Sequence, residues 1–132
     1  MPKVFTSKSQ RTGEFGEQIA VRYLQRKGFV VIERNYTRPC GEIDIIAQFG
    51  GIRHFVEVKA MTGALSSVQS REGIYRPEDG MHFEKVRRLR RTVASYLSEG
   101  HWKGEWQFDL VTIWLNPTTR QAQVKHLDNI IL

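Results

Sequence analysis

The chain has 132 residues and a mass of 15.3 kDa, with 40% hydrophobic and 26% charged residues, a composition typical of one globular domain. Its net charge of +6 and pI near 9.8 favour a polyanionic partner, either nucleic acid or an anionic membrane surface. No apolar run approaches the roughly 20 residues of a membrane span, and the N-terminus lacks the apolar core of a signal peptide. Cys40 is the one cysteine, so an intrachain disulfide is excluded. We therefore expect a cytoplasmic protein.

The first predicted element is a helix from Gly13 to Lys27, preceded by a basic, flexible arm over residues 1–11. Thr12 is the expected N-cap and Gly28 the expected stop. Apolar residues recur with helical spacing at Phe15, Ile19, Ala20, Tyr23 and Leu24. Glu17 falls at the border of this apolar arc, where it either reaches over the edge of a sheet or is an ordinary surface glutamate.

A strand over residues 29–36 and a turn over 37–40 lead into a predicted β-hairpin. Residues 41–47 and 54–59 alternate polar and apolar on either side of Gly50-Gly51, which suits a two-residue turn. That turn places Asp44 opposite Glu57 and Lys59 opposite Glu42, all four on one face, whereas a three-residue turn would shift the pairing by one. The opposite, core face takes Ile43, Ile45, Ala47, Val56 and Val58.

The opposed carboxylates of Asp44 and Glu57 are the most informative pair in the chain. At about 5 Å and an effective dielectric near 20, they repel each other by roughly 3 kcal/mol. A divalent cation such as Mg²⁺, which prefers oxygen ligands, would remove that cost. The alternative is a solvated polar face, with a Lys59–Glu42 salt bridge and Asp44 merely tolerated.

The second half of the chain begins with an irregular segment, residues 61–80, which is either a flap over the charged face or disordered. A helix follows over residues 82–99, with a buried stripe of Val86, Leu89, Val93, Tyr96 and Leu97. Its first half carries Lys85, Arg87, Arg88, Arg90 and Arg91, which form either a phosphate-binding surface or a solvated face. Strands over 106–115 and 121–127 and an apolar tail over 130–132 complete the order α-β-β-β-α-β-β. The four histidines are scattered along the chain, so no zinc cluster is expected.

These residues resemble a known family. Gly16-Glu17, Asn35-Tyr36, Gly41-Glu42-Ile43-Asp44, Val56-Glu57-Val58-Lys59 and Phe108-Asp109 are similar to the YraN-like family of small bacterial proteins. That family is related by similarity to the PD-(D/E)XK nucleases, which include archaeal Holliday-junction resolvases. The resemblance covers residues 13–127 and implies one α/β domain over 12–132, a restriction-endonuclease-like mixed sheet flanked by helices.

The resemblance also implies roles for individual residues. Asp44, Glu57 and the backbone carbonyl of Val58 would bind Mg²⁺ or Mn²⁺, Glu17 would complete the metal environment, and Lys59 would orient the attacking water. The basic helix, through Lys85, Arg87, Arg88 and Arg91, would bind nucleic acid, most simply DNA. Three functions stay open: a metal-dependent nuclease acting on branched or structured DNA, a nucleic-acid-binding module without turnover, and an interaction protein or homodimer that uses the apolar tail and exposed tryptophans.

Overall fold

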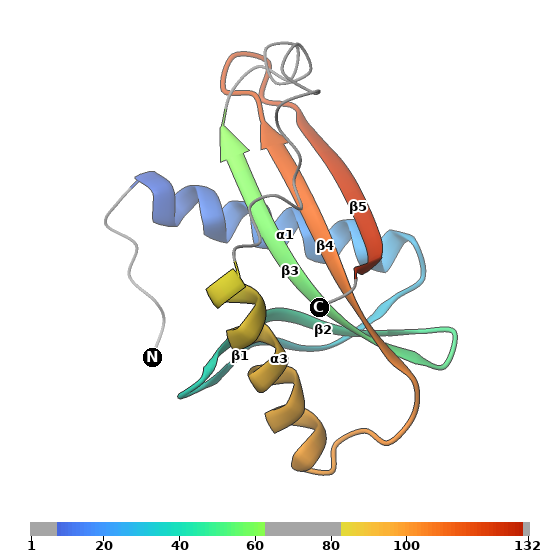
Figure 1. Cartoon of the computed structure of the whole chain (residues 1–132). Coiled ribbons are helices and arrows are strands. Elements are labelled where there is room, and N and C mark those ends of the chain that lie inside the picture. The colour runs from blue at the N-terminus through green and yellow to red at the C-terminus, as the bar shows by residue number, and fades with distance from the viewer. Residues whose placement is uncertain (1–7, 63–82, 131–132) are drawn as a thin grey trace.

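The computed structural model describes residues 8–62 and 83–130, which form a five-stranded sheet with one helix on each face (Figure 1). The elements are α1 (Lys8–Arg26), β1 (Val30–Arg38), β2 (Gly41–Phe49), β3 (Ile52–Thr62), α3 (Phe83–Ser98), β4 (Trp106–Leu115) and β5 (Ala122–Ile130). The strands lie in sequence order, antiparallel except for the parallel pair β3–β4. This mixed α/β architecture confirms the predicted fold class and element order.

Helix α1 begins earlier than predicted. It starts at Lys8, so Thr12 lies inside the helix and is not its N-cap. Lysine, glutamine and arginine are good helix formers, and neither glycine nor proline interrupts residues 8–12. The predicted end is confirmed: Gly28 has φ of 97°, and the backbone N–H of Phe29 donates to the carbonyl of Leu24 at 2.9 Å.

The central hairpin has the predicted two-residue turn. Gly50 and Gly51 have φ of 57° and 78°, values that glycine adopts without steric cost. The pairs from Phe49↔Ile52 to Ile45↔Val56 keep the register that this turn dictates. The three-residue alternative is therefore wrong. Strand β3 continues to Thr62, and the predicted flap lies almost entirely outside the described residues.

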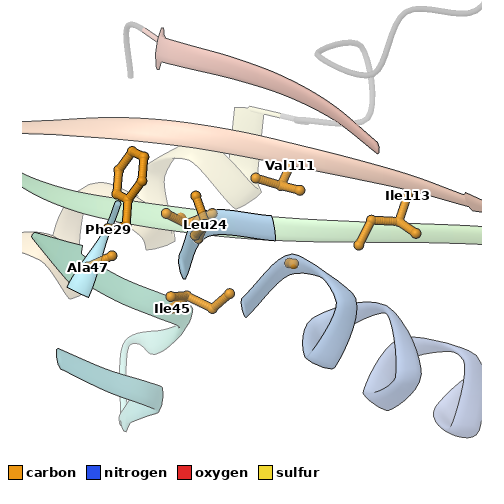
Figure 2. Close-up of a cluster of buried hydrophobic side chains, with 8 residues drawn as sticks. Leu24, Phe29, Ile45, Ala47, Val111 and Ile113 are labelled. Atoms are coloured by element: carbon orange, nitrogen blue, oxygen red, sulfur yellow. The ribbon is translucent and has the colours of Figure 1, made fainter. Parts of the chain in front are cut away.

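Each face of the sheet carries its own hydrophobic core. Helix α1 packs on a cluster with Ala20, Leu24, Phe29, Ile45, Ala47, Val56, Val111 and Ile113 (Figure 2). Helix α3 packs on the opposite face, on a cluster with Tyr36, Ile43, Ile46, Phe55, Leu89, Val93, Tyr96 and Phe108. The sheet separates these two clusters.

The prediction that Ile43 and Ile45 share a face is wrong. Ile43 packs with the α3 cluster and Ile45 with the α1 cluster, although the two residues are two apart on β2. The pairs Arg34↔Ile45 and Tyr36↔Ile43 flank Asn35, which has φ of 54°. A left-handed residue in β1 breaks the regular pleat, so the two-residue alternation fails at this point.

Helix α3 presents the predicted apolar stripe to the sheet, with Leu89, Val93 and Tyr96 buried. Of the three tryptophans, Trp106 is exposed, Trp102 is partly exposed and Trp114 is buried. Strand β5 runs to Ile130, three residues beyond the predicted end. None of the described helices has the length and hydropathy needed to cross a membrane.

Candidate metal centre and nucleic-acid interface

The candidate site lies where β2 separates from β3. The described pairing of these strands ends at Ile45↔Val56, whereas β3 stays paired with β4 to its end. Asp44 directly precedes Ile45 on β2, and its Oδ2 accepts a hydrogen bond from the backbone N–H of Val58 at 2.7 Å. The carboxylate thus takes the place of a strand partner for this amide, which holds Asp44 beside Glu57.

Asp44 and Glu57 form a pair of neighbouring acidic side chains. Burial of Asp44, together with its hydrogen bond to Glu57 and the negative charge of that residue, raises the pKa of Asp44 to about 9. Glu57 is only 7% exposed. With this raised pKa, Asp44 keeps its proton at neutral pH, which reduces the repulsion between the two carboxyl groups. The site holds this proton where a cation could instead neutralise both carboxylates.

Lys85 belongs to the acidic centre as well as to the basic helix. Its Nζ lies 2.7 Å from Glu57 Oε2, although the lysine side chain is 43% exposed. A cavity of about 240 Å³ between β2, β3 and α3 is lined by both of these residues and by Gly41, Glu42, Arg88, Leu89 and Thr92. Two basic side chains, Lys85 and Arg88, therefore lie on the wall of the cavity that contains Glu57.

Glu17 reaches the same centre from the other face of the sheet. A Cβ on Gly16 would lie 2.5 Å from Ala60 Cβ, so only glycine allows α1 to pack this closely on β3. The close packing brings Glu17 near enough to Asp44 for its negative charge to contribute to the raised pKa of Asp44. Glu17 therefore reaches the edge of the sheet, where it lies beside Arg34 of β1, and is not an ordinary surface glutamate.

Lys59 lies on β3 two residues after Glu57, so both side chains leave the strand on one face. It is partly buried and pairs with Thr112 of β4. The ladder between β2 and β3 ends before Lys59 and Glu42, so these two residues are not cross-strand neighbours within it. Lys59 therefore flanks the Asp44–Glu57 pair along β3.

The basic face of α3 continues away from the acidic centre. Arg87, Arg88, Arg90 and Arg91 are all exposed. Arg87 Nη1 lies 3.6 Å from Glu84 Oε1, a surface ion pair one turn along the helix that contributes little to stability. The structure thus places Lys85 and Arg88 at the cavity, with the other arginines further out on the same helix.

Comparison with known proteins places the chain in a family. The model of "Uncharacterised protein family UPF0102" matches residues 16–113, most of the described fold. The chain belongs to the UPF0102 family. It is 36% identical to a UPF0102 protein of Moorella thermoacetica over 121 residues, which cover 91% of this chain and 94% of the relative. A UPF0102 protein of Dictyoglomus turgidum is 33% identical over 122 residues, covering 92% and 97% of the two chains.

The family match extends through Asp109, which lies in a buried cluster that the sequence pattern does not reveal. Asp109 Oδ2 accepts hydrogen bonds from His54 Nδ1 at 2.7 Å and from His126 Nε2 at 2.9 Å. Its Oδ1 accepts Gln107 Nε2 at 2.9 Å and the backbone N–H of Asn129 at 3.0 Å. His54 and His126 are far apart along the chain, but they meet at Asp109 because β4 brings β3 and β5 together.

The donor set of the UPF0102 site suits a hard divalent cation. Asp44 and Glu57 offer carboxylate oxygens, and a cation would replace the proton that Asp44 retains. Within residues 8–62 and 83–130, no group of three or more histidine, cysteine, aspartate or glutamate side chains is already gathered as a metal site. Mg²⁺ or Mn²⁺ would therefore need further ligands, such as the Val58 carbonyl, water and phosphate oxygens of a substrate.

Proposed function

We propose that this UPF0102 protein is a metal-dependent nuclease that hydrolyses phosphodiester bonds, in DNA of branched or otherwise altered structure. The observation that carries the proposal is the Asp44–Glu57 pair, in which a partly buried and a buried carboxyl group lie side by side and the pKa of Asp44 is raised to about 9, although Lys85 already pairs with Glu57. A protein that only binds nucleic acid has no need of such a pair. The fold and the basic helix fit this function but would fit a binding module equally well.

Each residue of the site would have its own role in the reaction. Asp44 and Glu57 would hold Mg²⁺ or Mn²⁺ together with the Val58 carbonyl, and Glu17 would complete the surroundings of the metal from α1. When bound, the cation would supply positive charge to the scissile phosphate and lower the pKa of a water molecule. Lys59 would orient that water and stabilise the charge that develops on the phosphate.

The substrate would approach from the side of α3. Lys85 and Arg88 line the cavity that contains Glu57, so a phosphate group in it would meet two cations beside the metal ligands. Lys85 Nζ would exchange its contact with Glu57 for one with the phosphate. Arg87 and Arg91 would then contact neighbouring phosphates of the same strand. The single cysteine agrees with our placement of this reaction in the reducing environment of the cytoplasm.

Lys59→Ala tests the proposal, because it separates catalysis from binding. We expect cleavage to fall by about a hundredfold or more, the scale for the loss of one positioned electrostatic group, while the Tm and metal affinity stay close to those of the parent. The assay compares single-stranded, duplex and branched DNA and RNA with Mg²⁺ or Mn²⁺. Lys103→Ala, at an exposed lysine between α3 and β4, is the matched control and should cut like the parent.

Three outcomes contradict the proposal in different ways. If Lys59→Ala cuts as fast as the parent, Lys59 has no role in catalysis. If the parent binds the substrates but cuts none of them, the function is that of a nucleic-acid-binding module. A parent that neither binds nor cuts would favour an interaction protein or a homodimer, with the exposed Trp106 region as a candidate surface.

A further inference from the structure

Asn35 lies beside two acidic residues of the site, Glu17 and Glu42, although the proposed reaction assigns it no role. Its pairing neighbours are Arg34↔Ile45 and Tyr36↔Ile43, so Asn35 faces Asp44 across the β1–β2 ladder. With its side-chain amide turned to face hydrogen-bond acceptors, Asn35 Nδ2 lies 3.1 Å from Glu17 Oε1 and 2.9 Å from Glu42 Oε1. One amide group thus joins a carboxylate from α1 to a carboxylate from β2.

We propose that Asn35 is a positioning residue, which holds Glu17 in place beside the Asp44–Glu57 pair by bridging it to Glu42. The inference rests on the proposed metal site. An amide of this kind, which bonds to a residue in the surroundings of a metal, fixes the direction of its oxygens and tunes metal affinity.

The identity of the residue supports this role. Asn35 has φ of 54°, a conformation that glycine, asparagine and aspartate adopt most readily. Glycine would allow the backbone but would supply no hydrogen-bond donor. Aspartate would add another negative charge beside Glu17 and Glu42. Asparagine alone among the three combines this backbone conformation with a neutral donor.

The neighbouring arginine does not replace the amide. Arg34 Nη2 lies 3.7 Å from Glu17 Oε1, an ion-pair distance too long for a hydrogen bond. In the part of the chain that the structure describes, Arg34 Nε and Nη2 are buried without a hydrogen-bond partner. Through Nη2, Arg34 therefore supplies charge near Glu17, whereas Asn35 supplies a directional hydrogen bond to it.

Asn35→Gly tests the inference, because glycine keeps the backbone conformation and removes only the amide. We expect the dissociation constant for Mn²⁺, measured by calorimetry without nucleic acid, to rise about 10- to 100-fold. The Tm should fall by no more than roughly 4 °C. The control is Asn129→Gly, because Asn129 has φ of 53° on β5 and its substitution makes the same chemical change away from the site. The control should bind Mn²⁺ within about twofold of the parent.

A double variant tests whether Asn35 acts through Glu17. In a Glu17→Gln background, Asn35→Gly should weaken Mn²⁺ binding by no more than about threefold, because the carboxylate that it positions is already gone. Unchanged Mn²⁺ affinity in Asn35→Gly, with the parent binding normally, would overturn the positioning role and leave the metal site standing. A full loss in the double variant would show that Asn35 acts by another route. If the parent itself binds no Mn²⁺, the metal site fails and the inference falls with it.

Discussion

Two aspartates lie on the two strands that flank β3, and folding shifts their pKa values in opposite directions. On β4, burial opposes the ionisation of Asp109, but hydrogen bonds from His126, His54, Gln107 and Asn129 outweigh it and hold the pKa of Asp109 well below its usual range. On β2, burial and Glu57 raise the pKa of Asp44 to about 9. The chain itself supplies hydrogen-bond donors to the carboxylate of Asp109, whereas it places the carboxyl group of Asp44 beside a second acid, Glu57.

This difference separates a structural site from a functional one. The donors around Asp109 come from three strands, so the cluster ties β3, β4 and β5 together and needs no ligand. The Asp44–Glu57 pair costs stability as it stands, and a cation would remove that cost. Perturbed carboxyl groups in a cavity are candidates for function, whereas satisfied ones are usually structural.

Asp109→Asn should have the largest effect on folding. The substitution removes the charge and turns an amide N–H₂ towards groups that already donate, so we expect a loss of about 3 kcal/mol of unfolding free energy. The Tm should fall by roughly 10 °C, measured by thermal denaturation at pH 7.5. A Tm within about 2 °C of the parent would mean that the cluster does not hold the strands together.

Asp44→Asn should have a smaller effect of opposite sign, and one that depends on pH. A carboxyl group whose pKa is raised by folding adds stability only at low pH, because the folded chain keeps a proton that the unfolded chain releases near 3.8. The contribution of Asp44 therefore falls as the pH rises from about 4 to about 9. Near pH 8 the variant should melt a few degrees above the parent, since about 1 kcal/mol corresponds to roughly 3–5 °C here.

The pH dependence is checked by Tm measurements of parent and variant from pH 4 to pH 9 without divalent ions. The difference should widen steadily with pH and nearly vanish at pH 4. A variant that is less stable than the parent at every pH by a constant amount would contradict the raised pKa of Asp44. The contrast between the two aspartates would then be lost.

Much of the site could be predicted because local rules determine it. Gly50-Gly51 fixes the hairpin register, and the register brings Asp44 to Glu57. The basic residues of α3 follow from helical periodicity. Local rules failed where the geometry is irregular or non-local. The left-handed residue Asn35 interrupts the regular pleat, and Ile43 lies on the other face of the sheet as a result. A strict two-residue alternation in the sequence cannot predict such an interruption.

The remaining errors have a common physical cause, which is the placement of elements relative to one another. His54 and His126 meet because the sheet order puts β4 between β3 and β5. Lys85 reaches Glu57 because α3 packs across β2 and β3, an arrangement that periodicity does not specify. Periodicity identifies the buried face of α3 but leaves open which strand residues the helix covers.

Calorimetric titration of Mg²⁺ and Mn²⁺ tests most directly whether the Asp44–Glu57 pair is a cation site. The parent should bind one ion and release protons in the process near pH 7.5, because the cation displaces the proton that Asp44 retains; buffers of different ionisation enthalpy reveal that release. Asp44→Ala should abolish the binding, whereas Asp128→Ala, at an exposed aspartate on β5, should leave it intact. Binding to Asp44→Ala as tight as binding to the parent would contradict the account.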